Sequence, residues 1–362
     1  MNALREMGED SAPRAPALLE VDDLAVHFHV PGSGWKQRKR VLRAVDGVSF
    51  SVAERETLGI VGESGCGKST LARALLRLVP TSGGHLHYAG RDLLALDAKS
   101  LRPLRRELQI IFQDPLAALD PRMTVGQIIG EPLRALRADL PRAERHARVL
   151  AMMQRVGLLP NQVNRYAHEF SGGQAQRIGI ARALAVEPRL LVCDEPVSSL
   201  DVSIKSQVIN LLQDLKTERA LTLVFIAHDL ASVRHIAQRV LVLYLGRVVE
   251  IASRDAIFAQ PMHPYTRMLF AAAPIPDPDA ARRVRAAPVR GEIPSPFDPP
   301  SGCAFRTRCS FAIERCSAER PRLRDLSGGQ VACHRAEELL TQTIPLPAPD
   351  AGDAHAAAAS WS

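Results

Sequence analysis

Residues 62–70 carry the chemistry around which the rest of the chain is organised. They follow the G-x-x-x-x-G-K-S spacing of a phosphate-binding loop, with an apolar run at 57–61 before them and a helical pattern at 71–76 after them. The glycines would let backbone N–H groups surround a phosphate, and the helix start would add its positive dipole end. A chance glycine-rich turn is the alternative, and it is disfavoured because every fixed position matches. The predicted nucleotide-binding residues of the loop are Gly62, Glu63, Ser64, Gly65, Cys66, Gly67, Lys68, Ser69 and Thr70.

Within this loop, two side chains have specific predicted roles. Lys68 would reach the β- and γ-phosphates, and the Ser69 hydroxyl would bind Mg²⁺. A buried strand at 190–194 ends in the carboxylate of Asp194, which suits the Mg²⁺ shell, and Glu195 follows it. Glu195 could polarise an attacking water, whereas a simple capping role before a proline is the alternative.

The order of the elements predicts an α/β fold. Buried strands alternate with helices, as in a doubly wound core whose ligand lies at the carboxyl ends of the strands. Another buried strand at 221–227 ends at His228, so each motif lies at such an end. Residues 127–136 and 142–156 have apolar residues at helical spacing with no strand pattern between them, which predicts a helical subdomain over about 114–170.

Composition limits the classes of partner. The 362 residues have a formal net charge of +7, but the charges are spread along the chain and only 4% of residues are aromatic, which disfavours a nucleic-acid partner. The basic stretch 35–40 could contact lipid headgroups, although a solvated loop is preferred. We find no apolar run long enough to span a bilayer and no signal-peptide pattern, so work at a membrane would require a partner that spans it.

Because these motifs follow one another in a fixed order along the chain, the sequence resembles the nucleotide-binding subunit of ATP-binding-cassette (ABC) transporters over about residues 18–252. Two substitutions depart from the usual pattern: Phe170 stands where leucine is commonest in the signature motif, and Ser199 stands where alanine is usual in the D-loop. The matching segments are the Walker A loop 62–70, the Q-loop residue Gln113, the signature 170–174, the Walker B strand 190–194 with Glu195, the D-loop 198–201, the switch residue His228, and Phe28 at the adenine-stacking position.

The resemblance implies a P-loop NTPase with a mixed sheet core, an antiparallel β subdomain and a helical subdomain, binding ATP and Mg²⁺. It implies that two cassettes sandwich two ATP molecules, so that the signature of one faces the Walker loop of the other. The resemblance implies that the catalytic residues are Glu195, His228 and Gln113, and that Ser69, Asp194 and Gln113 form the Mg²⁺ site. The signature residues are Ser171, Gly172, Gly173 and Gln174, and the D-loop contributes Asp201.

The tail resembles the oligopeptide/dipeptide/nickel uptake branch of this family. The resemblance rests on the segments 263–266, 291–295, 302–305, 308–309 and 331–334, together with Cys316. It implies three partners: permease subunits, a second ATPase subunit that is either a copy of this chain or a different chain, and a periplasmic binding protein that is coupled indirectly. It also implies a peripheral location on the cytoplasmic face of the inner membrane. Peptides are the implied cargo, and nickel, glutathione or sugar are alternative cargoes. Two other classes of protein also stay open: a soluble cassette ATPase without a permease, and a regulatory module without catalysis.

The predicted organisation is a disordered N-terminus at 1–17, an ATPase domain at 18–262, a C-terminal extension at 263–340 and a disordered tail at 341–362. The extension holds Cys303, Cys309, Cys316 and Cys333, whose C-x₅-C-x₆-C-x₁₆-C spacing could serve a [4Fe–4S] cluster or Zn²⁺, or leave four unliganded thiols. Residues 326–330 repeat the signature letters, but no long amphipathic helix follows, so we interpret them as a coincidental turn.

Overall fold

The computed structural model describes residues 17–31, 40–198, 200–272 and 292–341. The chain divides into two compact units, residues 1–248 and 249–362, which are described separately. The predictions of disorder for 1–16 and 342–362 lie outside the described residues, as do those for the basic stretch 35–39, Ser199 and Gly291. The domain boundary predicted at 262–263 stays a prediction.

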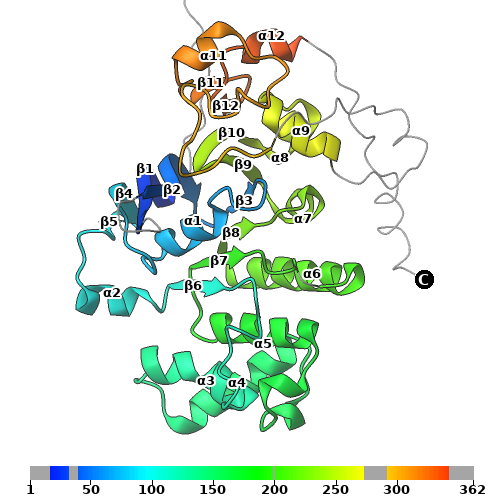
Figure 1. The fold of residues 1–362 in the computed structure, drawn as a ribbon. Helices are drawn as coiled ribbons and strands as arrows, with labels where there is room; N and C mark the ends of the chain where they lie inside the picture. Colours follow the sequence, from blue (N-terminus) through cyan, green and yellow to red (C-terminus); the bar gives the residue numbers. More distant parts are fainter. Residues whose placement is uncertain (1–16, 32–39, 199, 273–291, 342–362) are drawn as a thin grey trace, which may run out of the picture. The chain divides into compact units, whose positions relative to one another are not determined.

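A parallel sheet forms the core of the first unit, in the order β9–β3–β8–β7–β6. Every residue of β3, β7 and β8 is buried, which explains why these strands are unbroken apolar runs rather than alternating patterns. The strands are β3 Thr57–Val61, β6 Leu108–Ile111, β7 Leu190–Asp194, β8 Thr222–Ile226 and β9 Arg239–Tyr244. The helices that follow β3, β7 and β8 along the chain are α1 Lys68–Leu75, α6 Val202–Arg219 and α7 Leu230–Ile236. The predicted α/β core is confirmed (Figure 1).

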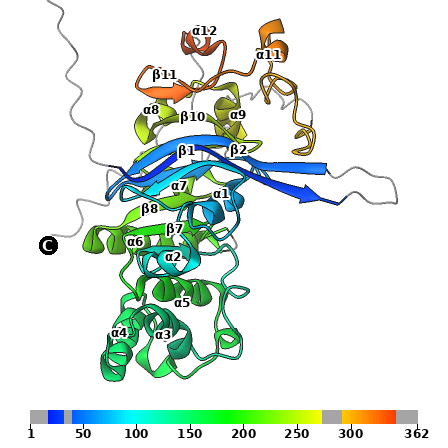
Figure 2. The same cartoon turned by 90° about the vertical axis from the view of Figure 1, so that its left-hand side faces the viewer.

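A second, antiparallel sheet has the order β2–β1–β4–β5. Its long hairpin pairs β1 with β2 and contains several register shifts, which Figure 2 shows as two extended, twisted strands. The pairing of β2 with β1 continues to Arg40, which lies opposite Val30. The bounds are β1 Ala17–Val30, β2 Arg40–Ala53, β4 Gly83–Tyr88 and β5 Arg91–Asp92.

Between residues 114 and 170 the regular elements are helices and short 3₁₀ turns, with one isolated bridge between Thr124 and Tyr166, and the bounds of the helical subdomain stay a prediction. Thr124 forms a capping box with Gln127 at the start of the first helix, which supplies partners for the free N–H groups there. The helices are α3 Val125–Leu136 and α4 Arg142–Arg155, with short 3₁₀ turns at Pro160–Gln162 and Ala167–Glu169. They are preceded by α2 Ala98–Leu104 and followed by α5 Gly172–Leu184. None of the helices in the described ranges has the length and apolar character needed to cross a bilayer.

The second unit contains a small antiparallel arrangement that sequence patterns did not predict. Glu250 of β10 pairs with Val331 of β12, and β12 pairs with β11. Ser327 and Gly328 connect β11 and β12 with φ values of 46° and 78°, the positive values that a two-residue type I′ hairpin turn requires. The interpretation of 326–330 as a turn is therefore confirmed. The elements are β10 Arg247–Ser253, α8 Arg254–Ala259, α9 Pro264–Ala272, α11 Glu314–Ala318, β11 Arg324–Leu326, β12 Gly329–Val331 and α12 Ala336–Leu340.

Candidate functional site

The loop between β3 and α1 wraps tightly against the backbone of other strands. A Cβ atom at Gly67, where φ is 108°, would lie 2.1 Å from the carbonyl oxygen of Ala44. A Cβ atom at Gly62 would lie 2.2 Å from the carbonyl oxygen of Leu243. Glycine is therefore required at both positions by close approach, and at Gly67 also by conformation.

Lys68 lies within this loop with a side chain that is only 4% exposed. Its Nζ donates hydrogen bonds to the carbonyl oxygens of Gly62 at 2.8 Å and Glu63 at 3.1 Å. The same nitrogen is 3.6 Å from Oε1 of Glu195. The ammonium group is thus placed between the loop backbone and the carboxylate that follows β7.

Ser69 and Asp194 lie 125 residues apart in the sequence and form one oxygen pair. The Ser69 hydroxyl donates a hydrogen bond to Oδ1 of Asp194 at 2.9 Å. Burial raises the pKa of Asp194, while the Ser69 hydrogen bond and the charge of Arg73 act in the opposite direction. Two adjacent hard oxygen ligands suit Mg²⁺, so these residues fit the predicted metal site.

Glu195 is the point where the remaining predicted catalytic side chains meet. Its Oε2 accepts a hydrogen bond from Nε2 of Gln113 at 3.2 Å and lies 3.3 Å from Nδ1 of His228. The backbone of Glu195 is in the left-handed region, with φ at 47°. Such a conformation is costly for a residue with a side chain, and it occurs where surrounding structure determines it, often at functional sites.

The signature motif lies apart from this cluster. Ser171 caps α5: its Oγ accepts from the N–H of Gln174 at 3.4 Å, and its own N–H donates to Oε1 of Gln174 at 3.1 Å. Ser171, Gly172 and Gln174 are exposed and Gly173 is half-buried. In Figure 1, α5 lies below β6, away from α1. The start of this helix therefore faces solvent.

Two further predicted residues also lie outside the Glu195 cluster. Phe28 is half-buried in β1 and is paired with Leu42 of β2. Asp201 is exposed at the start of α6 and makes no side-chain capping bond there. The nucleotide roles of these residues stay predictions.

Backbone groups that support the loop were not predicted. The N–H of Gly246 donates to the carbonyl of Cys66 at 2.8 Å, and the Ala44 carbonyl lies against Gly67. These contacts use main-chain atoms, so residue types give no signal for them. Only the pairing of distant strands could have indicated them.

Comparison with known families agrees with this geometry. The ABC transporter family model matches residues 45–198, and the model for the oligopeptide/dipeptide transporter C-terminal region matches residues 249–316. The oligopeptide transport ATP-binding protein OppF of Escherichia coli K12 is 55% identical over 324 residues, which cover 89% of this chain and 97% of that protein. This chain belongs to the ABC transporter family. The predicted family and its ATPase activity are thereby confirmed.

Other relatives give the same assignment. OppF of Haemophilus influenzae is 53% identical over 306 residues, covering 84% of this chain and 92% of that protein. A dimeric post-hydrolysis structure of the cassette MJ0796, bound to ADP and Pi, is 27% identical with a TM-score of 0.59, covering 65% of this chain and 98% of that one. CbiO1 of Clostridium perfringens, part of a transporter complex, has a TM-score of 0.57 at 27% identity, covering 67% of this chain and 91% of that one. Membership of the ABC ATPase family implies that this cassette binds ATP with Mg²⁺.

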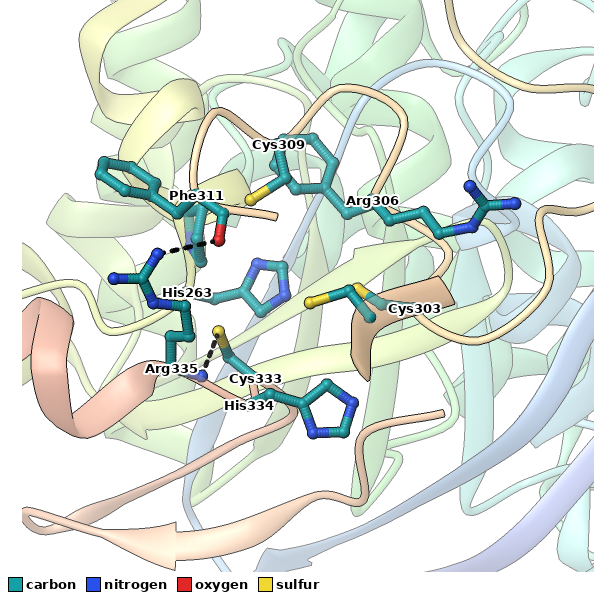
Figure 3. A pocket seen from close by; sticks show the side chains of 11 residues that line it. His263, Cys303, Arg306, Cys309, Phe311, Cys333, His334 and Arg335 are labelled. Atoms are coloured by element: carbon teal, nitrogen blue, oxygen red, sulfur yellow. Dashed lines mark hydrogen bonds between the residues drawn. The ribbon is translucent and has the colours of Figure 1, made fainter. Parts of the chain in front are cut away.

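The second unit of this ABC ATPase brings its four late cysteines to one small cavity of about 10 Å³. Figure 3 shows the sulfur atoms of Cys303, Cys309 and Cys333 directed toward the same space. The backbone N–H of Cys303 donates to the Cys316 carbonyl at 2.8 Å, which aligns those two segments. The other residues that line the cavity are His263, Pro264, Phe305, Arg306, Phe311, His334 and Arg335.

The side chains around this cavity bear on the predicted metal site. Among the described residues, no three or more His, Cys, Asp or Glu side chains are placed to hold a metal ion. Nδ1 of His263 accepts a hydrogen bond from the N–H of Tyr265 at 3.0 Å, and burial lowers the pKa of His263 to about 3. The six cysteines of the chain are free thiols.

Burial makes three of these thiols weak nucleophiles at neutral pH. It raises the pKa of Cys303, Cys309 and Cys333 to about 11. Because only the thiolate reacts, we expect alkylation by iodoacetamide to be slow at neutral pH and to accelerate about tenfold per pH unit until the pH approaches that pKa. Peptide mass spectrometry after timed quenching would give each rate, with urea-unfolded protein as the control. A rate that levels off below the ordinary cysteine pKa would contradict protonated thiols and indicate stabilised thiolates.

Proposed function

We propose that this chain is the ATP-hydrolysing subunit of a peptide importer, docked on permease subunits at the cytoplasmic face of the inner membrane. The observation that carries the proposal is the extent of the match: similarity to the OppF proteins continues beyond the cassette and covers 97% of the Escherichia coli protein. The C-terminal region model supports the same branch. A periplasmic binding protein would deliver cargo to the permease.

The mechanism follows from the contacts around Glu195. Lys68 and the loop N–H groups hold the phosphates, and the Glu195 carboxylate takes a proton from the attacking water. Gln113 and His228 orient that carboxylate through its Oε2 atom. Ser69, Asp194 and Gln113 would hold Mg²⁺, which supplies positive charge to the phosphate oxygens when it is bound.

A second cassette would complete the site. The exposed start of α5 offers free backbone N–H groups and the positive end of a helix dipole, which suit a γ-phosphate supplied by another subunit. The dimeric MJ0796 structure, similar over 65% of this chain, supports such pairing. The partner is either a second copy of this chain or a different cassette of the same complex.

The two serines of the repeated signature letters give a matched test of this arrangement. We expect Ser171→Ala to reduce ATP turnover of the assembled transporter on the order of 10²-fold, since it removes the hydroxyl that caps α5 and that would donate to the transferred phosphate in the paired cassettes. Ser327→Ala lies in the hairpin turn of the second unit and should leave turnover within about twofold. Steady-state phosphate release from the purified complex would measure both. The reverse pattern would overturn the assignment of the signature.

The cargo is tested by reconstitution. The chain would be co-purified with its permease subunits, placed in liposomes with the cognate binding protein, and assayed for ATPase activity against dipeptides, oligopeptides, glutathione and nickel chelates. We expect stimulation by peptides alone. Stimulation by another compound would show that the cargo is not a peptide and would leave the mechanism of hydrolysis unchanged. If no membrane partner co-purifies and no compound stimulates the ATPase activity, the result would favour a soluble cassette ATPase.

Two alternatives from the sequence are less well supported. A soluble ABC ATPase commonly carries a coiled-coil insertion or a second cassette, whereas residues 114–170 form only short helices. A regulatory module without catalysis would not need the convergence of Lys68, Gln113 and His228 on Glu195. Metal binding by the four cysteines, as an iron–sulfur cluster or Zn²⁺, stays a proposal: four thiols line one cavity, but the described side chains are not placed to hold an ion, and no step depends on it.

A further inference from the structure

A charged cluster beside the phosphate loop has no part in the mechanism above. Oδ2 of Asp46 accepts hydrogen bonds from Nε and Nη2 of Arg247 at 2.8 and 2.6 Å. Oδ1 of the same carboxylate lies 3.3 Å from Nε2 of His27. The side chains of Asp46 and Arg247 are only 15% and 16% exposed, so water screens this pair weakly.

The cluster lies where three segments meet through backbone contacts. The N–H of Asp46 donates to the carbonyl of Gly246 at 2.8 Å, and the N–H of Gly246 donates to the carbonyl of Cys66 in the phosphate loop, also at 2.8 Å. The Ala44 carbonyl lies against Gly67 on the other side of the same junction. The Asp46–Arg247 pair therefore joins two of the segments that support the loop.

His27 connects this junction to β1, where the next residue is Phe28. The register of the β1–β2 pair shifts between Val26 and His27, and such a bulge redirects the side chains that follow it. The backbone N–H of His27 also donates to the hydroxyl of Ser82 at 2.9 Å. His27 is thus held from its ring and from its backbone, immediately before Phe28.

We propose that Asp46 is a positioning residue for the adenine ring: it connects the strand that carries Phe28 to the phosphate loop through His27 and Arg247. The inference rests on the proposed function and on the predicted stacking of Phe28 on adenine. It assigns Asp46 no contact with the nucleotide. Its effect is on the distance between the base-binding strand and the phosphate-binding loop.

The cluster makes use of the charge and of both oxygens of a carboxylate. Asp46 uses its two oxygens separately, one for the guanidinium group and one for the imidazole ring. An asparagine would keep one acceptor but would present an NH₂ donor to one of these two neighbours, and it would lose the charge that pairs with Arg247. Asp46→Asn is therefore a nearly isosteric change that should disturb the connection without creating a cavity.

The test compares two ligands on the full-length chain by isothermal titration calorimetry. Mg–ATP reports base and phosphate binding together, and inorganic tripolyphosphate with Mg²⁺ reports the phosphate loop alone. We expect Asp46→Asn to weaken ATP binding about tenfold and to change tripolyphosphate binding by less than about twofold. An equal loss for both ligands would show that Asp46 only supports the phosphate loop, and no loss for either would show that it has no role; each result overturns the proposal.

Two control variants separate this inference from the proposed function. Glu56→Gln breaks another partly buried ion pair of the first unit, with Arg239 at 3.0 Å, and should leave the ratio of the two affinities unchanged. Phe28→Ala tests the adenine contact directly and should reproduce the selective loss. If Phe28→Ala leaves ATP binding unchanged, the adenine assignment fails whatever Asp46 does. If Phe28→Ala shows the loss and Asp46→Asn does not, only the inference about Asp46 fails.

Discussion

The register of three parallel strands is the constraint on which this site depends. Ile226 of β8 is paired both with Ile60 of β3 and with Asp194 of β7, so the three strands reach the same row together. Directly after that row, β3 continues into the phosphate loop, β7 is followed by Glu195, and β8 leads to His228. A slip of one residue in any pair would turn the side chains to the other face and separate these groups. Catalytic geometry here is a consequence of backbone pairing between strands that are distant in the sequence, since β3 and the β8 strand beside it are more than 100 residues apart.

Much of this could be predicted from sequence because local patterns carry it. The apolar runs at β3, β7 and β8 mark buried strands, and the phosphate-loop spacing places Lys68 and Ser69 without knowledge of the fold. The alternation of strands and helices gives the fold class. Ser69 and Asp194 were both assigned to the Mg²⁺ site from their motifs, and the structure brings them within hydrogen-bond distance.

The rest could not be predicted, because it depends on long-range contacts of the main chain. Nothing in the types of Ala44 or Gly246 shows that their carbonyl and amide groups support the phosphate loop. The strained backbone of Glu195 is set by its surroundings rather than by its own preference. In the second unit, the sequence identified the cysteines but not the β11–β12 hairpin or the cavity, since short strands leave little periodic signal.

In the proposed mechanism, ATP hydrolysis depends on the Glu195 carboxylate, which is held by Gln113 and His228. The most direct measurement compares Mg–ATP binding and steady-state phosphate release for Glu195→Gln and the unaltered chain in the assembled transporter. Glutamine has nearly the same shape but cannot take the proton from water, so we expect unchanged ATP affinity and a loss of turnover on the order of 10²-fold or more. Near-normal hydrolysis by the variant would contradict it.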